Sequence, residues 1–267
     1  MDNRHFALEG LDLTGKRILE IGPLNRPLVE KSDDRTVFYA DHCSTETLKE
    51  KYSADPSVPN DDICKVDIDI SKQTIAEASE KFGQFDIIVA SHVIEHVPNL
   101  VGWLSELTGA LKVGGIIALT IPDKRYTFDF FRRETSFWMV EEAFNENRHR
   151  PSEDQVLDYF VTTVSADCKM LWADPDHSKQ LKRATDNDVA LHWLNAHRQG
   201  MYVDCHCWIF TNNSFLELLR EIVVHYNLSI DLKMFRETKQ DQLDFHAQFI
   251  KVAPETKPSD WDKYFAP

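Results

Sequence analysis

The feature that most constrains the fold is a pair of apolar runs separated by a spacer of helical length. The first, at 85–96 (FDIIVASHVIEH), breaks into a polar turn that carries His92, Glu95 and His96. The second lies at 111–122 (LKVGGIIALTIP). Because parallel strands need a crossover of a dozen or more residues, the spacing predicts a strand–helix–strand unit. Ligands of such sheets bind beyond the carboxyl ends of the strands, which is where the polar turn points.

The same alternation extends over most of the N-terminal half. Between residues 16 and 121, β-rich runs alternate with helical stretches, as is typical of a parallel sheet flanked by helices. We expect strands at 17–21, 37–40, 63–68, 85–90 and 115–121, and helices at 45–52, 72–82 and 100–111. A helix at 213–226 precedes two further strands, at 229–235 and 244–252, which predict an antiparallel hairpin at the sheet edge. The predicted fold class is α/β, with a doubly wound, mostly parallel seven-stranded sheet.

The rhythm changes after Pro122. Residues 123–205 contain long polar and aromatic stretches, and we expect helices there at 134–147, 152–164 and 179–199. This pattern predicts a helical cap at 123–205, inserted after the fifth strand, while 1–122 and 206–252 form the α/β core. The tail, 253–267, is expected to be a loosely attached arm.

Charge and cysteine content restrict the partners and the compartment. The chain has 44 acidic against 30 basic residues and a formal net charge of −14, which argues against binding to nucleic-acid phosphate or anionic lipid. Five cysteines in a chain of this length indicate reduced thiols. The N-terminus has no apolar signal segment, and no window approaches the length of a membrane span. We expect a cytoplasmic protein, whose oligomeric state the sequence leaves open.

A candidate ligand-binding residue lies at the end of each of the first three predicted strands. Gly22 directly follows the first strand, where a glycine lets the backbone approach a ligand closely. Asp41 follows the second, at a spacing that suits hydrogen bonds to ribose hydroxyls. Asp67, near the end of the third, is a candidate to bind the exocyclic amine of an adenine. Asp69 competes for that place, and either side chain is also explained by simple exposure to water.

Together these segments resemble the class I S-adenosylmethionine-dependent methyltransferases. The matching segments, ILEIGP, YAD, VDI, FDIIVASHVIEHVPN and LKVGGIIALTIPD, follow the family's order and spacing across residues 16–123. The first loop departs from the common form, because Leu24 and Arg26 replace its second and third glycines. The segments at 121–132 (IPDKRYTFDFFR) and 204–219 (DCHCWIFTNNSFLELL) resemble counterparts in bacterial methyltransferases associated with surface-polysaccharide glycosyltransferases.

The resemblance implies a Rossmann-like methyltransferase fold with S-adenosylmethionine as cofactor and S-adenosylhomocysteine as product. Carried over residue by residue, it assigns the cofactor to the loops after the first four strands: Glu20, Gly22 and Pro23 at the methionine half, Asp41 at the ribose, Asp67 and Ile68 at the adenine, and Ser91 and His92 beneath the sulfonium.

Methylation of a hydroxyl requires a group that removes its proton as the new bond forms. Histidine suits that task, and His96 and His206 are the foremost candidates, with His92 as a third. Each of them is about equally well explained as a packed side chain. Asp123, just past the fifth strand, is a candidate to orient the base or to bind a sugar hydroxyl.

The sequence assigns no metal ligands. Cys205 and Cys207 form a C-x-C with no second pair, which falls short of a zinc pattern. Dependence on a divalent cation such as magnesium stays open.

The predicted function is O-methylation of a sugar hydroxyl, on a surface glycan or its activated precursor, by in-line transfer with a histidine general base. One alternative keeps the cofactor and changes the acceptor to an amine or a phosphorus-linked oxygen of a small metabolite. Another is a non-catalytic or nicotinamide-dependent protein on a Rossmann-like sheet. Against the nicotinamide form, the G-x-G-x-x-G fingerprint is missing and no tyrosine has a lysine four places on.

Overall fold

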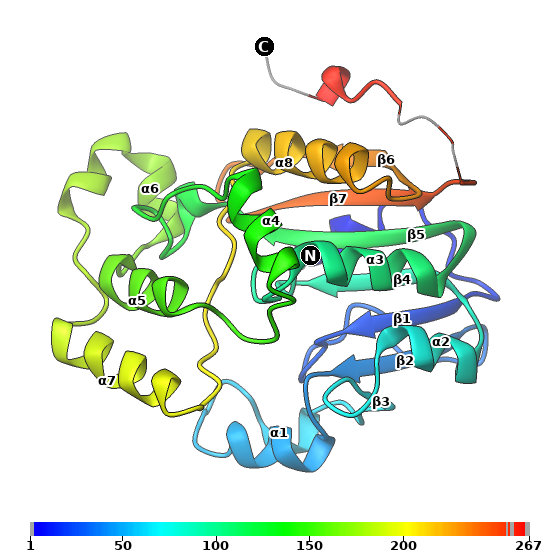
Figure 1. Ribbon diagram of the computed structural model, residues 1–267, viewed down its shortest axis with the longest axis horizontal. Helices are drawn as coiled ribbons and strands as arrows, with labels where there is room; N and C mark the ends of the chain where they lie inside the picture. Colours follow the sequence, from blue (N-terminus) through cyan, green and yellow to red (C-terminus); the bar gives the residue numbers. More distant parts are fainter. Residues whose placement is uncertain (1–2, 255, 257–258, 265–267) are drawn as a thin grey trace.

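The computed structural model describes residues 3–254, 256 and 259–264, and a seven-stranded sheet runs through its centre (Figure 1). The strands are β1 (Arg17–Ile21), β2 (Thr36–Asp41), β3 (Ile68–Asp69), β4 (Phe85–Ser91), β5 (Leu111–Pro122), β6 (Ile230–Arg236) and β7 (Asp244–Lys251). Their order is β3-β2-β1-β4-β5-β7-β6. Strands β1 to β5 are parallel to one another, whereas β7 is antiparallel to both of its neighbours, β5 and β6. The predicted seven-stranded α/β fold and its closing hairpin are confirmed.

The two faces of the sheet are covered differently. On one face, in front of the sheet in Figure 1, lie α2 (Ile75–Phe82), α3 (Leu100–Ala110), α4 (Phe137–Asn145) and α8 (Asn212–His225). Alternate strand positions, such as Leu19 and Ile88, pack with these helices in the main core. The other positions, such as Ile18 and Val89, face the short helix η1 (Asn3–Leu8) and the loop after β1.

Local capping fixes the start of α3 and, with it, the polar turn after β4. The side chain of Asn99 accepts the backbone N–H of Gly102 at 2.9 Å. Asparagine is among the best N-cap residues because its oxygen satisfies an N–H that the first helical turn leaves unpaired. The residues between Ser91 and Asn99 are therefore held at both ends, by a strand and by a capped helix.

The third strand differs from the prediction. It covers only Ile68–Asp69, whereas the sequence predicts a strand at 63–68. The preceding residues bond mostly outside the sheet: the N–H of Cys64 donates to the carbonyl of Leu24, in the loop after β1, and that of Val66 to the hydroxyl of Thr45, the first residue of α1 (Thr45–Lys51). Only the N–H of Asp67 reaches a strand, at the carbonyl of Tyr39 in β2. Apolar alternation alone does not distinguish a strand paired within the sheet from an extended segment that bonds to other parts of the chain.

The insertion after β5 forms a lobe to the left of the sheet in Figure 1, built from α5 (Glu153–Thr162), α6 (Cys168–Ala173) and α7 (Asn187–Arg198). The predicted helix at 179–199 begins only at Asn187, and α6 was not predicted. Helix α4 differs too, because Val140 and Ala143 are fully buried in the main core. That helix, although it lies within 123–205, packs against α3 and α8.

The described part of the tail is anchored, contrary to the prediction of a loose arm. Trp261 is fully buried in the main core, packs against Phe249, and donates its indole N–H to Asp231 at 2.7 Å. Part of the predicted arm, at 255, 257–258 and 265–267, lies outside the described residues. Among the helices of the described chain, none has the length and apolarity needed to cross a bilayer.

Candidate active site

Strand register brings three predicted residues to one edge of the sheet. The last residue of β1 pairs with the second-to-last residues of β2 and β4. Gly22 follows β1, while Asp41 and Ser91 end β2 and β4, so the three lie level with one another at the carboxyl edge. Open α/β sheets bind their ligands at this edge.

The loop after β1 is held by Glu20. Its buried carboxylate accepts the backbone N–H groups of Leu28 at 2.7 Å and Val29 at 2.9 Å. Burial raises the pKa of Glu20 to about 7, and the two N–H donors act in the opposite direction. The oxygens of Glu20 are thus engaged inside the loop, which differs from the predicted place at the methionine half of a cofactor.

Gly22 is required by the backbone. Its φ is +67°, which a residue with a side chain rarely adopts, and a Cβ there would lie 2.9 Å from Cγ2 of Val93. Pro23 follows in a tight turn, in which its carbonyl accepts the N–H of Arg26 at 2.9 Å. The loop after β1 therefore passes close to the turn after β4.

The acidic residue level with Asp41 is Asp69. The β-ladder pairs these two residues, and Asp41 is only 5% exposed. Oδ1 of Asp41 accepts the backbone N–H of His42 at 2.8 Å and lies 2.6 Å from Nδ1 of the same histidine. Oδ1 of Asp69 accepts the N–H and the hydroxyl of Ser71.

Asp67 and Ile68 lie further back than predicted. Oδ2 of Asp67 accepts the backbone N–H of Tyr39 at 2.9 Å and pairs with Lys31 at 2.7 Å. Ile68 is fully buried in the main core. The structure therefore disagrees with the prediction that this pair frames an adenine, because the strand continues to Asp69 before it reaches the edge.

His92 lies between two carboxylates. Its Nε2 is 3.0 Å from Oδ1 of Asp244 and its Nδ1 is 3.5 Å from Oε1 of Glu95. Burial acts to lower the pKa of His92, but the two carboxylates outweigh it and raise the pKa to about 10. The imidazole is therefore cationic at neutral pH and has no lone pair with which to accept a proton. Next to it, the buried hydroxyl of Ser91 has no hydrogen-bond partner among the described residues.

His96 and His206 each carry a carboxylate on Nδ1 and face one another. Nδ1 of His96 is 2.9 Å from Asp204, and Nδ1 of His206 is 2.6 Å from Asp129. The two rings are perpendicular, with centroids 4.7 Å apart. A carboxylate on Nδ1 favours the tautomer that carries its proton there and leaves the lone pair on Nε2. Burial acts to lower the pKa of His96, but Asp204 and Glu95 outweigh it and raise that pKa. The His96 side chain is 33% exposed and that of His206 is 8% exposed.

A buried arginine ties this pair to the insertion. Arg132 is 2% exposed, and its guanidinium bonds to Asp129 (3.0 Å), to Asp158 of α5 (2.8 Å) and to the carbonyl of His206 (2.9 Å). Each of its three nitrogens donates to a protein group, and the three groups belong to three segments. Arginine's fork of N–H groups suits such bridging, and here it fixes both the orientation of Asp129 and the backbone of the histidine.

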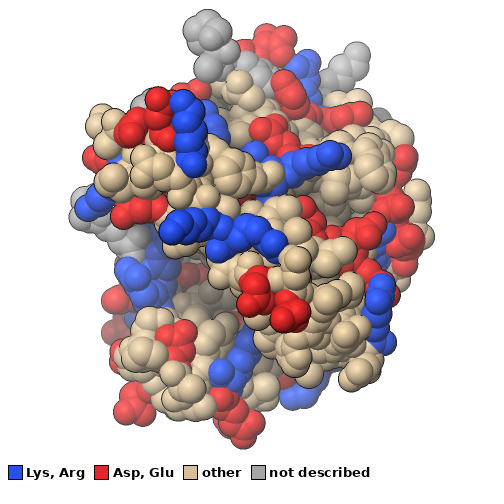
Figure 2. Space-filling view, turned by 90° about the vertical axis from the view of Figure 1, so that its left-hand side faces the viewer, with Lys and Arg blue, Asp and Glu red and all other residues tan. Residues whose placement is uncertain are grey.

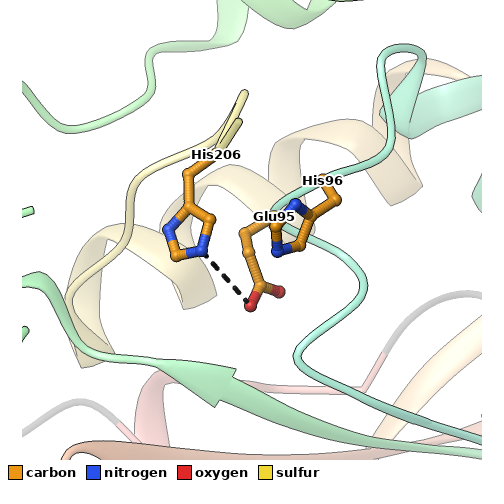
Figure 3. A group of neighbouring side chains, drawn as sticks. All are labelled: Glu95, His96 and His206. Carbon is orange, nitrogen blue, oxygen red and sulfur yellow. Dashed lines mark ion pairs between the residues drawn. The ribbon is translucent and has the colours of Figure 1, made fainter. Parts of the chain in front are cut away.

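Glu95 completes the cluster and was not among the predicted site residues. It is fully buried, and neither carboxylate oxygen has a hydrogen-bond partner among the described residues. Figure 3 shows its carboxylate directed toward the rings of His96 and His206, with Nε2 of His206 at 4.0 Å. Its position directly before His96 was visible in the sequence, but its inward orientation depends on the non-helical turn after β4.

Asp123 is not exposed at the carboxyl edge of the sheet. The residue is fully buried, and its carboxylate accepts bonds from the backbone and guanidinium of Arg125 and from the hydroxyl of Thr238 at 2.8 Å. The prediction of a catalytic role for Asp123 is corrected: it joins the end of β5 to the segment before β7.

Three comparisons with known proteins bear on this site. A family model described as a methyltransferase domain matches residues 1–222. A solved structure described provisionally as a zinc-dependent alcohol dehydrogenase from Rhodobacter sphaeroides is 16% identical, over 95% of this chain and 91% of that chain, with a TM-score of 0.50. At that identity it shows a shared fold and nothing about activity.

Other similar structures include one described provisionally as an S-adenosylmethionine-dependent methyltransferase from Listeria monocytogenes, at 11% identity over 93% of this chain and 97% of that chain (TM-score 0.47). A SAM-dependent methyltransferase from Methanosarcina mazei is 15% identical over 91% and 94%, respectively (TM-score 0.41). No match was found among the curated proteins.

Proposed function

The chain belongs to the methyltransferase-domain family, and we propose that it methylates a hydroxyl group of a sugar, on a surface glycan or its activated precursor. It is an S-adenosylmethionine-dependent methyltransferase. When bound, S-adenosylmethionine supplies a methyl group on a positively charged sulfur, which leaves as a neutral thioether once an acceptor attacks.

Two observations support the fit of the cofactor to the carboxyl edge. The loop after β1 meets the turn after β4 at Gly22, where a Cβ would lie 2.9 Å from Cγ2 of Val93, so two of the assigned segments lie side by side at this edge. The buried hydroxyl of Ser91 lacks a partner among the described residues, as expected of a group whose partner is a ligand. We assign Asp41 to the ribose hydroxyls, the Gly22–Pro23 backbone to the methionine half, and Asp69, in place of Asp67, to the adenine side.

The observation that carries hydroxyl methylation is the pair of carboxylate–histidine couples, His96–Asp204 and His206–Asp129. A hydroxyl is a poor nucleophile until its proton leaves, whereas an amine that is already neutral needs no base. Each Nε2 has a lone pair, and the carboxylate behind each ring stabilises the imidazolium that forms. Through one of these nitrogens, the acceptor O–H loses its proton as its oxygen bonds to carbon.

A sugar acceptor is supported by the aromatic side chains next to the histidines. The ring of Phe128 lies 4.8 Å from that of His206, and the side chain is partly exposed. Tyr202, close in sequence to Asp204, is 51% exposed. Flat aromatic faces beside polar groups suit a sugar ring, which has an apolar face and a hydroxylated rim. Figure 2 views the molecule from the left-hand side of Figure 1, where the lobe of α5, α6 and α7 lies, and shows a hollowed face on which acidic and basic side chains are interspersed.

The test is incubation with isotopically labelled S-adenosylmethionine and a panel of nucleotide sugars, lipid-linked sugars, amines and phosphonates, with the products located by mass spectrometry. We expect label on a sugar oxygen. Label on an amine or a phosphorus-linked oxygen only would overturn the acceptor assignment while leaving the family unchanged. Cofactor binding with no transfer to any acceptor of the panel or to cell extract would support a binding protein instead.

A further inference from the structure

The turn after β4 and the segment before α8 bring together three side chains that can ligate a metal ion. Glu95, His96 and His206 each offer one ligand atom, and these atoms lie within 4.8 Å of one another (Figure 3). We propose that Glu95, His96 and His206 form a binding site for a divalent first-row transition-metal ion, with open positions on the ion for the acceptor substrate or water.

The donor set matches the chemistry of such ions. Two imidazole nitrogens and one carboxylate oxygen suit Zn²⁺, Fe²⁺ or Mn²⁺, and two histidines with one acidic residue leave coordination positions free. Mg²⁺ prefers oxygen ligands, which disfavours it here. An ion about 2.1 Å from each donor needs donor atoms roughly 3 to 4 Å apart, so the three side chains need only a small inward shift to close around it.

The surroundings of the two histidines are those of metal ligands. A ligating histidine usually donates its second N–H to a carboxylate or carbonyl, which fixes the ring and leaves the other nitrogen free for the metal. Asp204 provides such a carboxylate at Nδ1 of His96, and Asp129 provides one at Nδ1 of His206. Both Nε2 atoms are thus available, and Arg132 holds Asp129 in place at 3.0 Å.

Glu95 provides the independent sign of a missing partner. A wholly buried carboxylate normally accepts hydrogen bonds on its oxygens, because burying an unsatisfied charge is costly. Glu95 is fully buried with neither oxygen hydrogen-bonded among the described residues, and its ion pair with Nδ1 of His92 is long, at 3.5 Å. A cation between Glu95 and the two histidines would satisfy it.

The proposed ion adds a catalytic step to the proposed function. Only this catalytic role of the ion rests on the proposed function. Bound to the ion, an acceptor hydroxyl has a lowered pKa, and its proton passes to solvent water as the oxygen forms its bond to the methyl carbon. In the loaded enzyme the histidines then act as ligands in place of free bases. Binding of the ion itself does not depend on the identity of the acceptor.

The test is titration of chelator-treated protein with Co²⁺, read by visible absorption and by calorimetry. We expect one equivalent to bind with the intense absorption of a low-coordinate nitrogen and oxygen site, to be displaced by Zn²⁺, and to be unaffected by Mg²⁺. Glu95→Gln, His96→Ala and His206→Ala should each weaken binding by at least about tenfold. Asp204→Asn changes a partly exposed residue, so it is less disruptive to folding. It should weaken Co²⁺ binding by about 10- to 100-fold, because it removes the carboxylate that orients His96.

The matched control is His225→Ala, which removes a histidine paired with Glu141 at 3.8 Å on an exposed surface. It should bind Co²⁺ like the wild type. No stoichiometric Co²⁺ binding, or equal binding by the wild type and by the ligand variants, would overturn the metal site. The two proposals fail separately: methyl transfer to sugars that resists chelation removes the catalytic role of the ion, whereas stoichiometric Co²⁺ binding without sugar methylation removes the sugar acceptor and leaves the metal site.

Discussion

The backbone carbonyl of Glu95 accepts the backbone N–H of Cys207 at 2.6 Å. A second bond, from the indole N–H of Trp208 to the carbonyl of Val97 at 2.6 Å, lies beside it. The turn after β4 and the segment before α8 are thus joined through groups that no substitution at His96 or His206 removes. Variants of the two histidines should therefore report on chemistry more than on folding.

Replacing His96 or His206 by alanine should reduce methyl transfer by about 10²- to 10⁴-fold, because each change removes a group that assists loss of the acceptor proton. Binding of S-adenosylhomocysteine should be unchanged, as measured by calorimetry. The control is His225→Ala, at an exposed position at the end of α8. Full activity in both single variants would remove the histidines from the reaction.

Asp41→Ala should weaken S-adenosylhomocysteine binding by about 10- to 100-fold, because hydrogen bonds to a charged group contribute about 1.5–3 kcal/mol each. Calorimetric titration measures the change. Asp55→Ala, which removes an exposed carboxylate elsewhere on the surface, should bind normally. Equal affinity of Asp41→Ala and wild type would leave the ribose without its assigned partner.

Gly22→Ala should lose both stability and cofactor affinity. The positive φ disfavours any side chain, and the new Cβ would meet Val93. Gly10→Ala is the matched control, since Gly10 has a similar φ of +72° but open space where the new methyl group would lie. Thermal unfolding should show a loss of roughly 1 kcal/mol for Gly10→Ala and more for Gly22→Ala. If the two variants behave alike, the contact with Val93 has no importance.

His246 should make stability depend on pH. Burial lowers the pKa of His246 to about 4, against a smaller opposing effect of Asp244. Above the ordinary pKa of about 6.5 both states are neutral and stability is complete; as the pH falls toward 4, the unfolded state binds a proton that the folded state does not. Between about pH 7.5 and about pH 5 the wild type should lose about 2 kcal/mol relative to His246→Gln, because the shifted groups His92 and Glu20 are present in both proteins. Urea unfolding of wild type and His246→Gln measures it, and an equal loss in both would refute the assignment.

Trp261→Ala should destabilise the protein by about 3–5 kcal/mol, the usual cost of truncating a buried aromatic side chain. Trp261→Phe keeps much of the packing and loses only the bond to Asp231, so it should cost about 1–2 kcal/mol. Denaturant unfolding distinguishes the two. Wild-type stability of the alanine variant would restore the picture of an unattached tail.

Much of the sheet was predictable because its strands are bounded by turn residues and buried on both faces. The runs at 17–21 and 85–90 coincide with β1 and β4 almost residue for residue. The third strand was not, because the segment from Ile63 bonds to Leu24 and Thr45, which lie near it only in the folded chain. The sequence therefore favoured Asp67 over Asp69 as the adenine contact, although β3 ends at Asp69.

The site was predictable in part. The positions of Gly22, Asp41 and Ser91 at the ends of predicted strands were enough to place them at one edge, because the register of parallel strands aligns their ends. They did not reveal that Asp123 is enclosed by Arg125 and Thr238, nor that Glu95 turns inward. Those depend on contacts between residues far apart in the sequence, and on a turn whose shape no local propensity specifies.

The insertion leaves and re-enters the core at neighbouring points, because the N–H of Lys124 bonds to the carbonyl of Phe210 and that of Thr135 to the carbonyl of Ile209. The stretch beyond these two contacts, residues 136–208, includes both the core helix α4 and His206. A chimaera that imports a foreign lobe must therefore keep α4 to preserve the core, and it would replace the histidine together with the surface that selects the acceptor.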